Sequence, residues 1–171
     1  PSLPSTRNVW YGVADAAKRP ILFAYSNPNS KCEIQPEDAI QWTDGKAILA
    51  TGSPFPPVTY KGKTYEIGQG NNAFVFPGVG LGAILAEARE VTDSMFLVAA
   101  KVVAECVSAE RLAMGTVYPD QSEMREVSAK IAAAVMRDAM RQGIGRTVPD
   151  AEVEQIVADG MWFPDYRPYV A

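Results

Sequence analysis

Two asparagine-bearing turns stand where a parallel sheet would present them to a ligand. A Ser-Asn-Pro turn at 26–28 follows the apolar run 21–25, and a Gly-Gln-Gly-Asn-Asn turn at 68–72 precedes the apolar run that begins at residue 73. The first turn is predicted to end a buried strand and the second to begin a helix. Ligands of open α/β sheets bind beyond the carboxyl ends of the strands, and helix N-termini attract carboxylate or phosphate groups. A carboxamide at each place predicts a small anionic ligand held by neutral donors.

The second turn carries the sharper signal. Two glycines permit close backbone approach, and the consecutive Asn71 and Asn72 are not both needed as helix caps. One of them can therefore satisfy the helix while the other projects its amide toward a ligand. An amide donates to a carboxylate and accepts from a hydroxyl group without a change of charge, which suits a hydroxy acid.

A third turn, Gly-Ser-Pro at 52–54, ends the next apolar run along the chain. Asn, Ser, Gly and Pro dominate turns for local reasons, so ordinary turn chemistry is the alternative explanation for this turn and for 26–28. Both turns, however, end successive strands of one predicted parallel unit. We therefore expect them at the same ligand-binding edge.

Two other motifs are expected to be structural. The glycine string at 78–83 matches G-x-G-x-x-A, but no strand precedes it and helices follow, so we expect a helix that another backbone approaches closely rather than a phosphate loop. Carboxylates cluster near two predicted helix starts, where acidic residues are favoured in any case. They are Glu33, Glu37 and Asp38, and Glu123 and Glu126.

The composition excludes several classes of function and site. The chain of 171 residues has a net charge of −4 and no His, which excludes His bases and His metal ligands from it. No basic face is visible, so a nucleic-acid partner is not expected. The longest apolar stretch, 73–86, contains Pro77 and is shorter than the ~20 residues that span a bilayer, so no membrane segment is expected. Cys32 and Cys106 form no CxxC pair, and we expect reduced thiols in a cytoplasmic protein.

The elements around these motifs follow from periodicity. A short helix is expected at 9–18. The continuous apolar run 21–25 predicts a strand buried on both faces, and a helix at 36–42 and a strand at 47–51 complete a parallel βαβ unit. A small hairpin is expected at 58–66, around Lys61-Gly62-Lys63.

The rest of the chain is predicted to be helical. Residues 73–89 are apolar nearly all round and predict a buried helix. Further helices are expected after a Thr92 cap, from a Ser122 cap to a stop at Gly143, and from Asp150. The aromatic, Pro-rich tail at 162–169 is expected to be extended and packed against another surface.

These elements predict an α/β fold: the end of a Rossmann-like parallel sheet, followed by a mostly helical C-terminal region. Two strands make a poor sheet alone. The strands that would complete it are not in this sequence, so we expect a fragment of a larger enzyme.

Several segments together resemble malic enzymes. In order, they are ILFAYSNP at 21–28, WTDGKA at 42–47, GSPF at 52–55, GQGNNAFVFPGVGLG at 68–82 and EVSAKIA at 126–132. The resemblance runs from about residue 19 to residue 143, and the block at 68–82 is its most specific part.

The resemblance implies oxidative decarboxylation of L-malate to pyruvate and CO₂ with NAD or NADP, assisted by Mg²⁺ or Mn²⁺. It places Asn27 between the nicotinamide and the substrate, Asn71 against malate, and Asn72 at the border of the same site, with Ser26 and Asn27 as cofactor-binding residues. It divides the chain into the C-terminal part of an NAD(P)-binding domain (1–70), a helical region that contributes to the substrate site (71–145) and a tail with a subunit contact (146–171). It also implies a cytoplasmic homo-oligomer, or a matrix protein in a eukaryotic organelle.

The departures from the family pattern are equally informative. The family's general-acid Tyr, catalytic Lys, three metal-binding carboxylates and Gly-rich cofactor loop all lie upstream of the matching region. We therefore expect no catalytic and no metal-binding residue in this chain, and we expect it to be inactive without the missing N-terminal part of the enzyme.

Two alternatives stay open at this point. A malolactic enzyme of the same family would convert malate to lactate with no net redox change, and the retained Asn residues do not separate the two reactions. A non-catalytic interaction or oligomerisation module is the alternative from another class, suggested by the helical second half and the aromatic tail.

Overall fold

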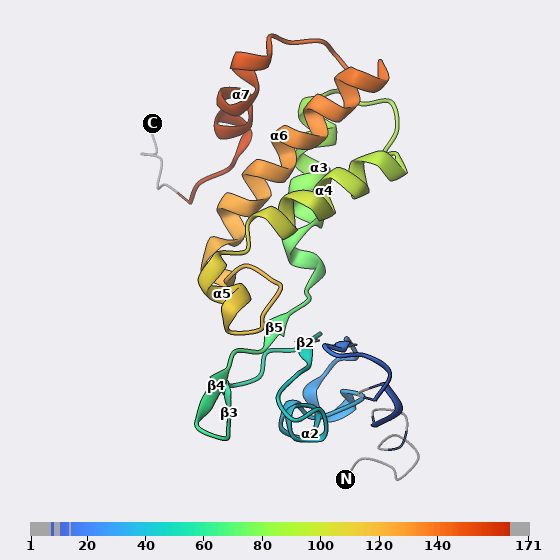
Figure 1. The fold of residues 1–171 in the computed structure, drawn as a ribbon. Coiled ribbons are helices and arrows are strands. Elements are labelled where there is room, and N and C mark those ends of the chain that lie inside the picture. Colours follow the sequence, from blue (N-terminus) through green and yellow to red (C-terminus); the bar gives the residue numbers. More distant parts are fainter. Residues whose placement is uncertain (1–7, 9–10, 14, 165–171) are drawn as a thin grey trace. The chain divides into compact units, whose positions relative to one another are not determined.

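The computed structural model describes residues 8, 11–13 and 15–164. The chain divides into two compact units, which are considered separately (Figure 1). Unit 1 comprises Pro1–Asn72 and Val103–Ser122, and unit 2 comprises Ala73–Val102 and Glu123–Ala171. Residues 8, 11–13 and 15–16 are helical, and the remainder of the helix predicted at 9–18 lies either outside the described residues or, at 17–18, outside the helix.

Unit 1 is built on a parallel sheet. Strand β1 (Ile21–Ala24), the short 3-10 helix η1 (Asn29–Lys31), helix α2 (Pro36–Trp42) and strand β2 (Ile48–Thr51) form the predicted βαβ unit. A third strand, β5 (Gly68–Gln69), pairs in parallel with β2, so the order is β1-β2-β5. The prediction of a parallel βαβ unit is confirmed. Strand β5 was not predicted, because its sequence contains no apolar run.

The predicted hairpin is present in unit 1. Strands β3 (Val58–Tyr60) and β4 (Lys63–Tyr65) pair antiparallel, with Tyr60 opposite Lys63. Lys61 and Gly62 form the two-residue turn, with φ values of 49° and 77°, as a hairpin turn of this length requires.

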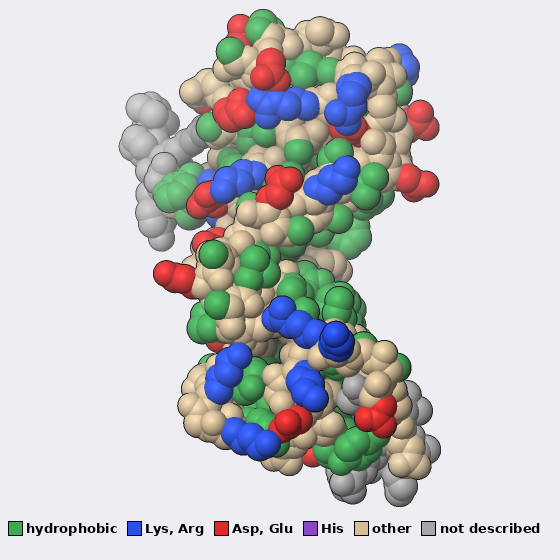
Figure 2. Space-filling model, in the orientation of Figure 1, with side chains coloured by type: hydrophobic (Ala, Val, Ile, Leu, Met, Phe, Trp, Pro, Cys, Tyr) green, Lys and Arg blue, Asp and Glu red, His purple; other side chains and the backbone are tan. Residues whose placement is uncertain are grey.

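The prediction that β1 is buried on both faces is wrong. Leu22 and Ala24 are 2% and 0% exposed and pack into a core with residues of α2 and β2, whereas Phe23 is 46% exposed. Ile21 and Tyr25, on the same side as Phe23, are also exposed. A strand has two faces with alternating side chains, and the face of β1 that carries Ile21 and Phe23 stays largely exposed. Figure 2 shows hydrophobic side chains on the surface of both units.

A further helix of unit 1, α5 (Ala109–Ala113), is not among the helices that the sequence predicted. The hydroxyl oxygen of Ser108 caps it by accepting a hydrogen bond from the Arg111 N–H at 3.2 Å. The 3-10 helix η3 (Gln121–Glu123) follows.

The predicted Ser122 cap is also wrong. Ser122 donates from its backbone N–H and its hydroxyl to Asp120 Oδ1, at 2.9 and 2.7 Å. Because Asp120 captures these donors, the turn continues as η3 and the long helix begins only at Met124.

Unit 2 is helical. Its main elements are α3 (Phe76–Leu85), α4 (Asp93–Glu105, which continues into unit 1), α6 (Met124–Gln142) and α7 (Val153–Gly160), with the 3-10 helices η2 (Asn72–Phe74) and η4 (Asp150–Glu152) before α3 and α7. Helix α3 packs against α6, and α7 packs against both. Gly143 ends α6 in the left-handed conformation, with φ 68°, which confirms the predicted stop. No helix among the described residues is long and apolar enough to cross a membrane.

The glycine string at 78–83 allows close helix packing, as predicted. A Cβ built on Gly78 would lie 2.8 Å from the Ser128 carbonyl oxygen, and one on Gly82 would lie 2.6 Å from the Ala132 carbonyl oxygen. Both neighbours belong to α6, so these glycines let α6 approach α3 closely. The prediction that 73–89 is one fully buried helix is wrong, because α3 is shorter and Ile84 is 74% exposed.

Little of the predicted aromatic tail is within the described residues, which end at Pro164. Arg125 in α6 donates from Nη2 to the Trp162 carbonyl oxygen at 2.9 Å. Its guanidinium group also lies 5.1 Å from the centre of the Phe163 ring. The start of the tail is thus attached to α6 in unit 2.

The packing of α3 predicts opposite effects for two substitutions in one helix. Gly82→Ala should lower the free energy of unfolding by about 1–3 kcal/mol, because the new methyl group collides with the α6 backbone. Gly80→Ala is the matched control: nothing lies within 4 Å of a Cβ there, and Ala should stabilise the helix by up to about 1 kcal/mol. Urea unfolding of both variants measures the difference. Equal effects would contradict this account of the helix contact.

Candidate functional site

Three turns of unit 1 meet at the carboxyl edge of its sheet. The backbone ladder continues past the strand ends: Gly52 N–H donates to the Ala24 carbonyl oxygen at 3.1 Å, and Gly70 N–H donates to the Thr51 carbonyl oxygen at 2.9 Å. Since neighbouring strands lie about 4.8 Å apart, the turns that follow β1 and β5 are separated by roughly 10 Å. The structure therefore brings the Asn27 turn and the Asn71 turn to one edge, with the β2 turn between them.

Asn27 is exposed at the end of β1. Its Oδ1 accepts a hydrogen bond from the hydroxyl group of Ser53, which is 7% exposed at the end of β2. A second bond joins the same two loops, because Asn29 Nδ2 donates to the Pro54 carbonyl oxygen at 2.9 Å. The Asn27–Pro28 peptide bond is cis.

Ser26 is held by Glu33 rather than directed outward. Its backbone N–H and its hydroxyl donate to the two Glu33 carboxylate oxygens, at 3.2 and 2.7 Å. Partial burial alone would raise the pKa of Glu33, but these hydrogen bonds outweigh it and lower the pKa below its ordinary value. The Glu33 carboxylate therefore fixes the beginning of the Ser-Asn-Pro turn.

Asn71 and Asn72 follow β5 at the same edge. Asn71 is half-buried and its backbone N–H donates to the Gln69 carbonyl oxygen at 3.2 Å. Asn72 is exposed and is the first residue of η2, so the expected helix start is present at this point of the chain.

Tyr25 lies between the two Asn turns. Its ring covers Gly70, where a Cβ would lie 2.4 Å from Tyr25 Cε1. Its hydroxyl group is 2.5 Å from that of Tyr118. Burial, followed by this hydrogen bond, raises the pKa of Tyr25, so its phenol stays protonated throughout the physiological range.

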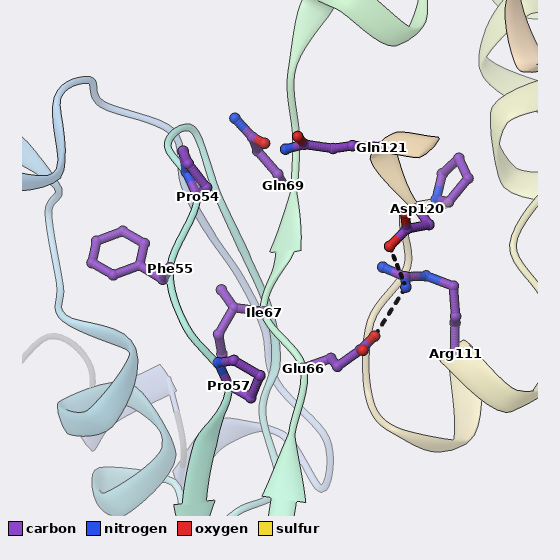
Figure 3. Close-up of a pocket in the computed structure, with 10 residues that line it drawn as sticks. Pro54, Phe55, Pro57, Glu66, Ile67, Gln69, Arg111, Asp120 and Gln121 are labelled. Carbon is purple, nitrogen blue, oxygen red and sulfur yellow. Dashed lines mark hydrogen bonds and ion pairs between the residues drawn. The ribbon is translucent and has the colours of Figure 1, made fainter. Parts of the chain in front are cut away.

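A hollow of about 350 Å³ lies next to this edge. Figure 3 shows Pro54, Gln69 and Gln121 around it, together with Arg111 and its two acidic partners. Its volume is at the lower end of the range for small-molecule sites.

Arg111 is a residue of this hollow that sequence reasoning missed. Its Nη1 lies 3.0 Å from Glu66 Oε2 and 3.2 Å from Asp120 Oδ2, and its Nε donates to the Tyr118 carbonyl oxygen at 3.0 Å. The guanidinium is thus paired with two carboxylates of this chain. No motif surrounds Arg111, and only the fold brings it to Glu66.

The described residues hold no group of three or more Asp, Glu, Cys or His side chains that could bind a metal ion. Neither Cys32 nor Cys106 is in a disulfide. Cys32 donates from Sγ to the Ile34 carbonyl oxygen at 3.2 Å, and partial burial raises the pKa of its thiol.

The model of the family "Malic enzyme, NAD binding domain" matches residues 6–140. The chain belongs to the malic enzyme family. The match includes the Asn27 turn, the Asn71 turn, all of α3 and α6 as far as residue 140.

Curated relatives agree with this assignment. The NAD-dependent malic enzyme of Aeromonas salmonicida is 48% identical over 151 residues, which cover 88% of this chain and 27% of that enzyme. The NADP-dependent malic enzyme of Dictyostelium discoideum is 43% identical over 154 residues, which cover 90% of this chain and 28% of the relative. The chain thus spans little more than a quarter of the length of these malic enzymes.

Solved malic enzymes share the fold. The enzyme from Pyrococcus horikoshii matches with a TM-score of 0.65 and 31% identity over 84% of this chain and 30% of its own. The enzyme from Entamoeba histolytica matches with a TM-score of 0.67 and 26% identity over 84% of this chain and 27% of its own. The predicted fold class, a parallel sheet with helices that forms a fragment of a larger enzyme, is confirmed.

The Ser26–Glu33 contact predicts a pH-dependent effect of Glu33→Gln. Because folding lowers the pKa of Glu33, the stabilisation is present above its ordinary pKa of about 4.3 and is lost as the pH falls through the folded value. Wild type should therefore melt at a higher temperature than Glu33→Gln at neutral pH, and the gap should shrink as the pH falls below the ordinary pKa of a Glu carboxyl. Thermal unfolding across this range measures it. A gap that stays constant would show that the charge of Glu33 plays no part.

The Tyr25–Gly70 contact predicts a substitution that one further change repairs. Gly70→Ala should lower the free energy of unfolding by about 1–3 kcal/mol, because the methyl group meets the Tyr25 ring. In a Tyr25→Ala background the same substitution should have little effect, since the ring is gone. Denaturant unfolding of the four proteins gives the coupling energy, and additive effects would contradict the contact.

Proposed function

We propose that this chain supplies part of the active site of a malic enzyme that converts L-malate to pyruvate and CO₂ with NAD or NADP. The observation that carries the proposal is the position of Asn27 and Asn71 at one carboxyl edge, within the region that matches the family's NAD-binding domain. Ligands of parallel sheets bind at this edge.

The proposed roles follow from the chemistry of each side chain. Asn71 binds malate, whose carboxylates and hydroxyl group match the donors and the acceptor of an amide, and Asn72 borders the same site. Asn27 lies between malate and the nicotinamide, and Ser26 adjoins the cofactor through the turn that Glu33 holds. Bound beside Ser26 and Asn27, NAD or NADP would supply the hydride acceptor for the oxidation of malate.

The chain's own contribution is binding and orientation. Amides hold the substrate by hydrogen bonds and add no charge to the site. In this proposal the groups for proton transfer and the Mg²⁺ or Mn²⁺ site belong to the rest of the enzyme, because the family's motifs for them lie upstream of the matching region. The isolated chain is accordingly proposed to be inactive.

The domain roles belong to the same proposal. Residues 1–70 form the C-terminal part of the NAD(P)-binding domain, 71–145 contribute to the substrate site, and 146–171 make a subunit contact. The whole enzyme is proposed to be a cytoplasmic homo-oligomer.

The test uses the full-length enzyme that contains this chain. Asn71→Ala and Asn27→Ala should each lower kcat/KM for malate by about 10–100-fold, because a hydrogen bond to a charged group contributes about 1.5–3 kcal/mol. Gln41→Ala removes an exposed amide on α2 and is the control. Initial rates of malate-dependent NAD and NADP reduction measure the effect.

Product analysis completes this experiment. Pyruvate and CO₂ formed together with the reduced cofactor support the proposed reaction, whereas lactate without the reduced cofactor would show a malolactic enzyme. Full activity in Asn71→Ala would show that the site is wrongly placed.

A further inference from the structure

We propose that Ser53 is a positioning residue that fixes the orientation of the Asn27 amide, so that its NH₂ group and not its oxygen faces the ligand. The inference rests on the proposed function, because the ligand is malate beside the nicotinamide. It assigns a role to a residue in the turn after β2 that touches neither of them in this proposal.

The contact itself joins two strand ends. The Ser53 hydroxyl donates to Asn27 Oδ1, so the oxygen of the amide is occupied by a neighbouring loop. No hydrogen bond within the described residues uses Asn27 Nδ2, and Asn27 is exposed. Both N–H bonds of this group are therefore available to an acceptor on a ligand.

A buried side chain of β2 holds the backbone of Ser53 in place. Thr51, which is 0% exposed, donates from Oγ1 to the Ser53 carbonyl oxygen at 2.9 Å. Gly52 brings the two strand ends together: a Cβ there would lie 2.1 Å from the Tyr25 carbonyl oxygen and 3.1 Å from Asn27 Nδ2. This close approach is what allows the short Ser53 side chain to reach the amide.

The burial of Ser53 selects one of the two amide orientations. If the Asn27 amide rotated by half a turn, its NH₂ group would face the hydroxyl, and the hydroxyl proton of Ser53 would lose its acceptor. Ser53 is 7% exposed, so water cannot readily replace that acceptor, and a buried polar group without a partner is costly. Asn27 in the observed orientation is thus a fixed donor.

A fixed donor matches the ligand chemistry. Malate carries two carboxylates and the nicotinamide carries a carboxamide oxygen, all of which accept hydrogen bonds. An Asn27 oxygen turned toward any of them would repel it. Without Ser53 the amide would populate both orientations, and binding of the substrate and cofactor would weaken.

A double-mutant cycle in the full-length enzyme tests this role. Ser53→Ala should lower kcat/KM for malate about tenfold in the wild-type background, the effect of one lost hydrogen bond. In the Asn27→Ala background it should change kcat/KM less than twofold, because the group that it orients is absent. Ser53→Cys keeps the shape and a weak donor, and should retain more activity than Ser53→Ala. Ser128→Ala, at a buried serine with 6% exposure in unit 2, is the matched control.

The outcomes separate the two proposals. If Asn27→Ala has full activity, the proposed function of this site fails. If Asn27→Ala is impaired but Ser53→Ala costs the same factor in both backgrounds, Ser53 acts through the general structure and only this inference is overturned. Melting temperatures identify a variant that does not fold, and in that case the cycle is run with Ser53→Cys, whose loss must also vanish in Asn27→Ala.

Discussion

The constraint on which the site depends is the parallel pairing of three short strands. A parallel ladder places every carboxyl end at the same edge, and here the ladder extends beyond the strands, through Gly52 N–H to Ala24 and Gly70 N–H to Thr51. Backbone hydrogen bonds alone therefore align the turns after β1, β2 and β5. The hydrogen bonds of Glu33 and Ser53 then set the orientation of individual groups within turns that already lie together.

The sequence predicts the parts of this arrangement that have a local signal. The apolar runs of β1 and β2, with α2 between them, indicate parallel strands. The position of each Asn turn was also predictable, because one directly follows an apolar run and the other directly precedes one. Strand β5 has no such signal, because Gly68 and Gln69 have low strand propensity and become a strand only by pairing with β2. The one-sided exposure of β1 escaped prediction for a related reason: an apolar run does not tell which of its faces is covered. The contact of Arg111 with Glu66 joins segments far apart in the sequence, and no pattern in either segment indicates it.

Arg111 and Glu33, two charged side chains near the edge, form ion pairs or hydrogen bonds within the chain. Arg111 pairs with Glu66 and Asp120, and the carboxylate of Glu33 accepts from Ser26. Free charges at the edge would strongly favour or repel an anion, whereas amides bind by the direction of their donors. In the site that we propose, the ligand is therefore selected by the orientation of the amides, and the Ser53 hydroxyl matters because it contacts the Asn27 amide.

Close packing against three glycines constrains the block at 68–82. In unit 1, Gly70 lies under the Tyr25 ring, and in unit 2, Gly78 and Gly82 lie against α6. A methyl group at any of these positions would come within 3 Å of a neighbouring atom, so the sequence tolerates few alternatives there. The two Asn residues stand between these constrained glycines. The two Asn residues thus follow the last strand of the sheet and precede the first helix of the α3–α6 pair.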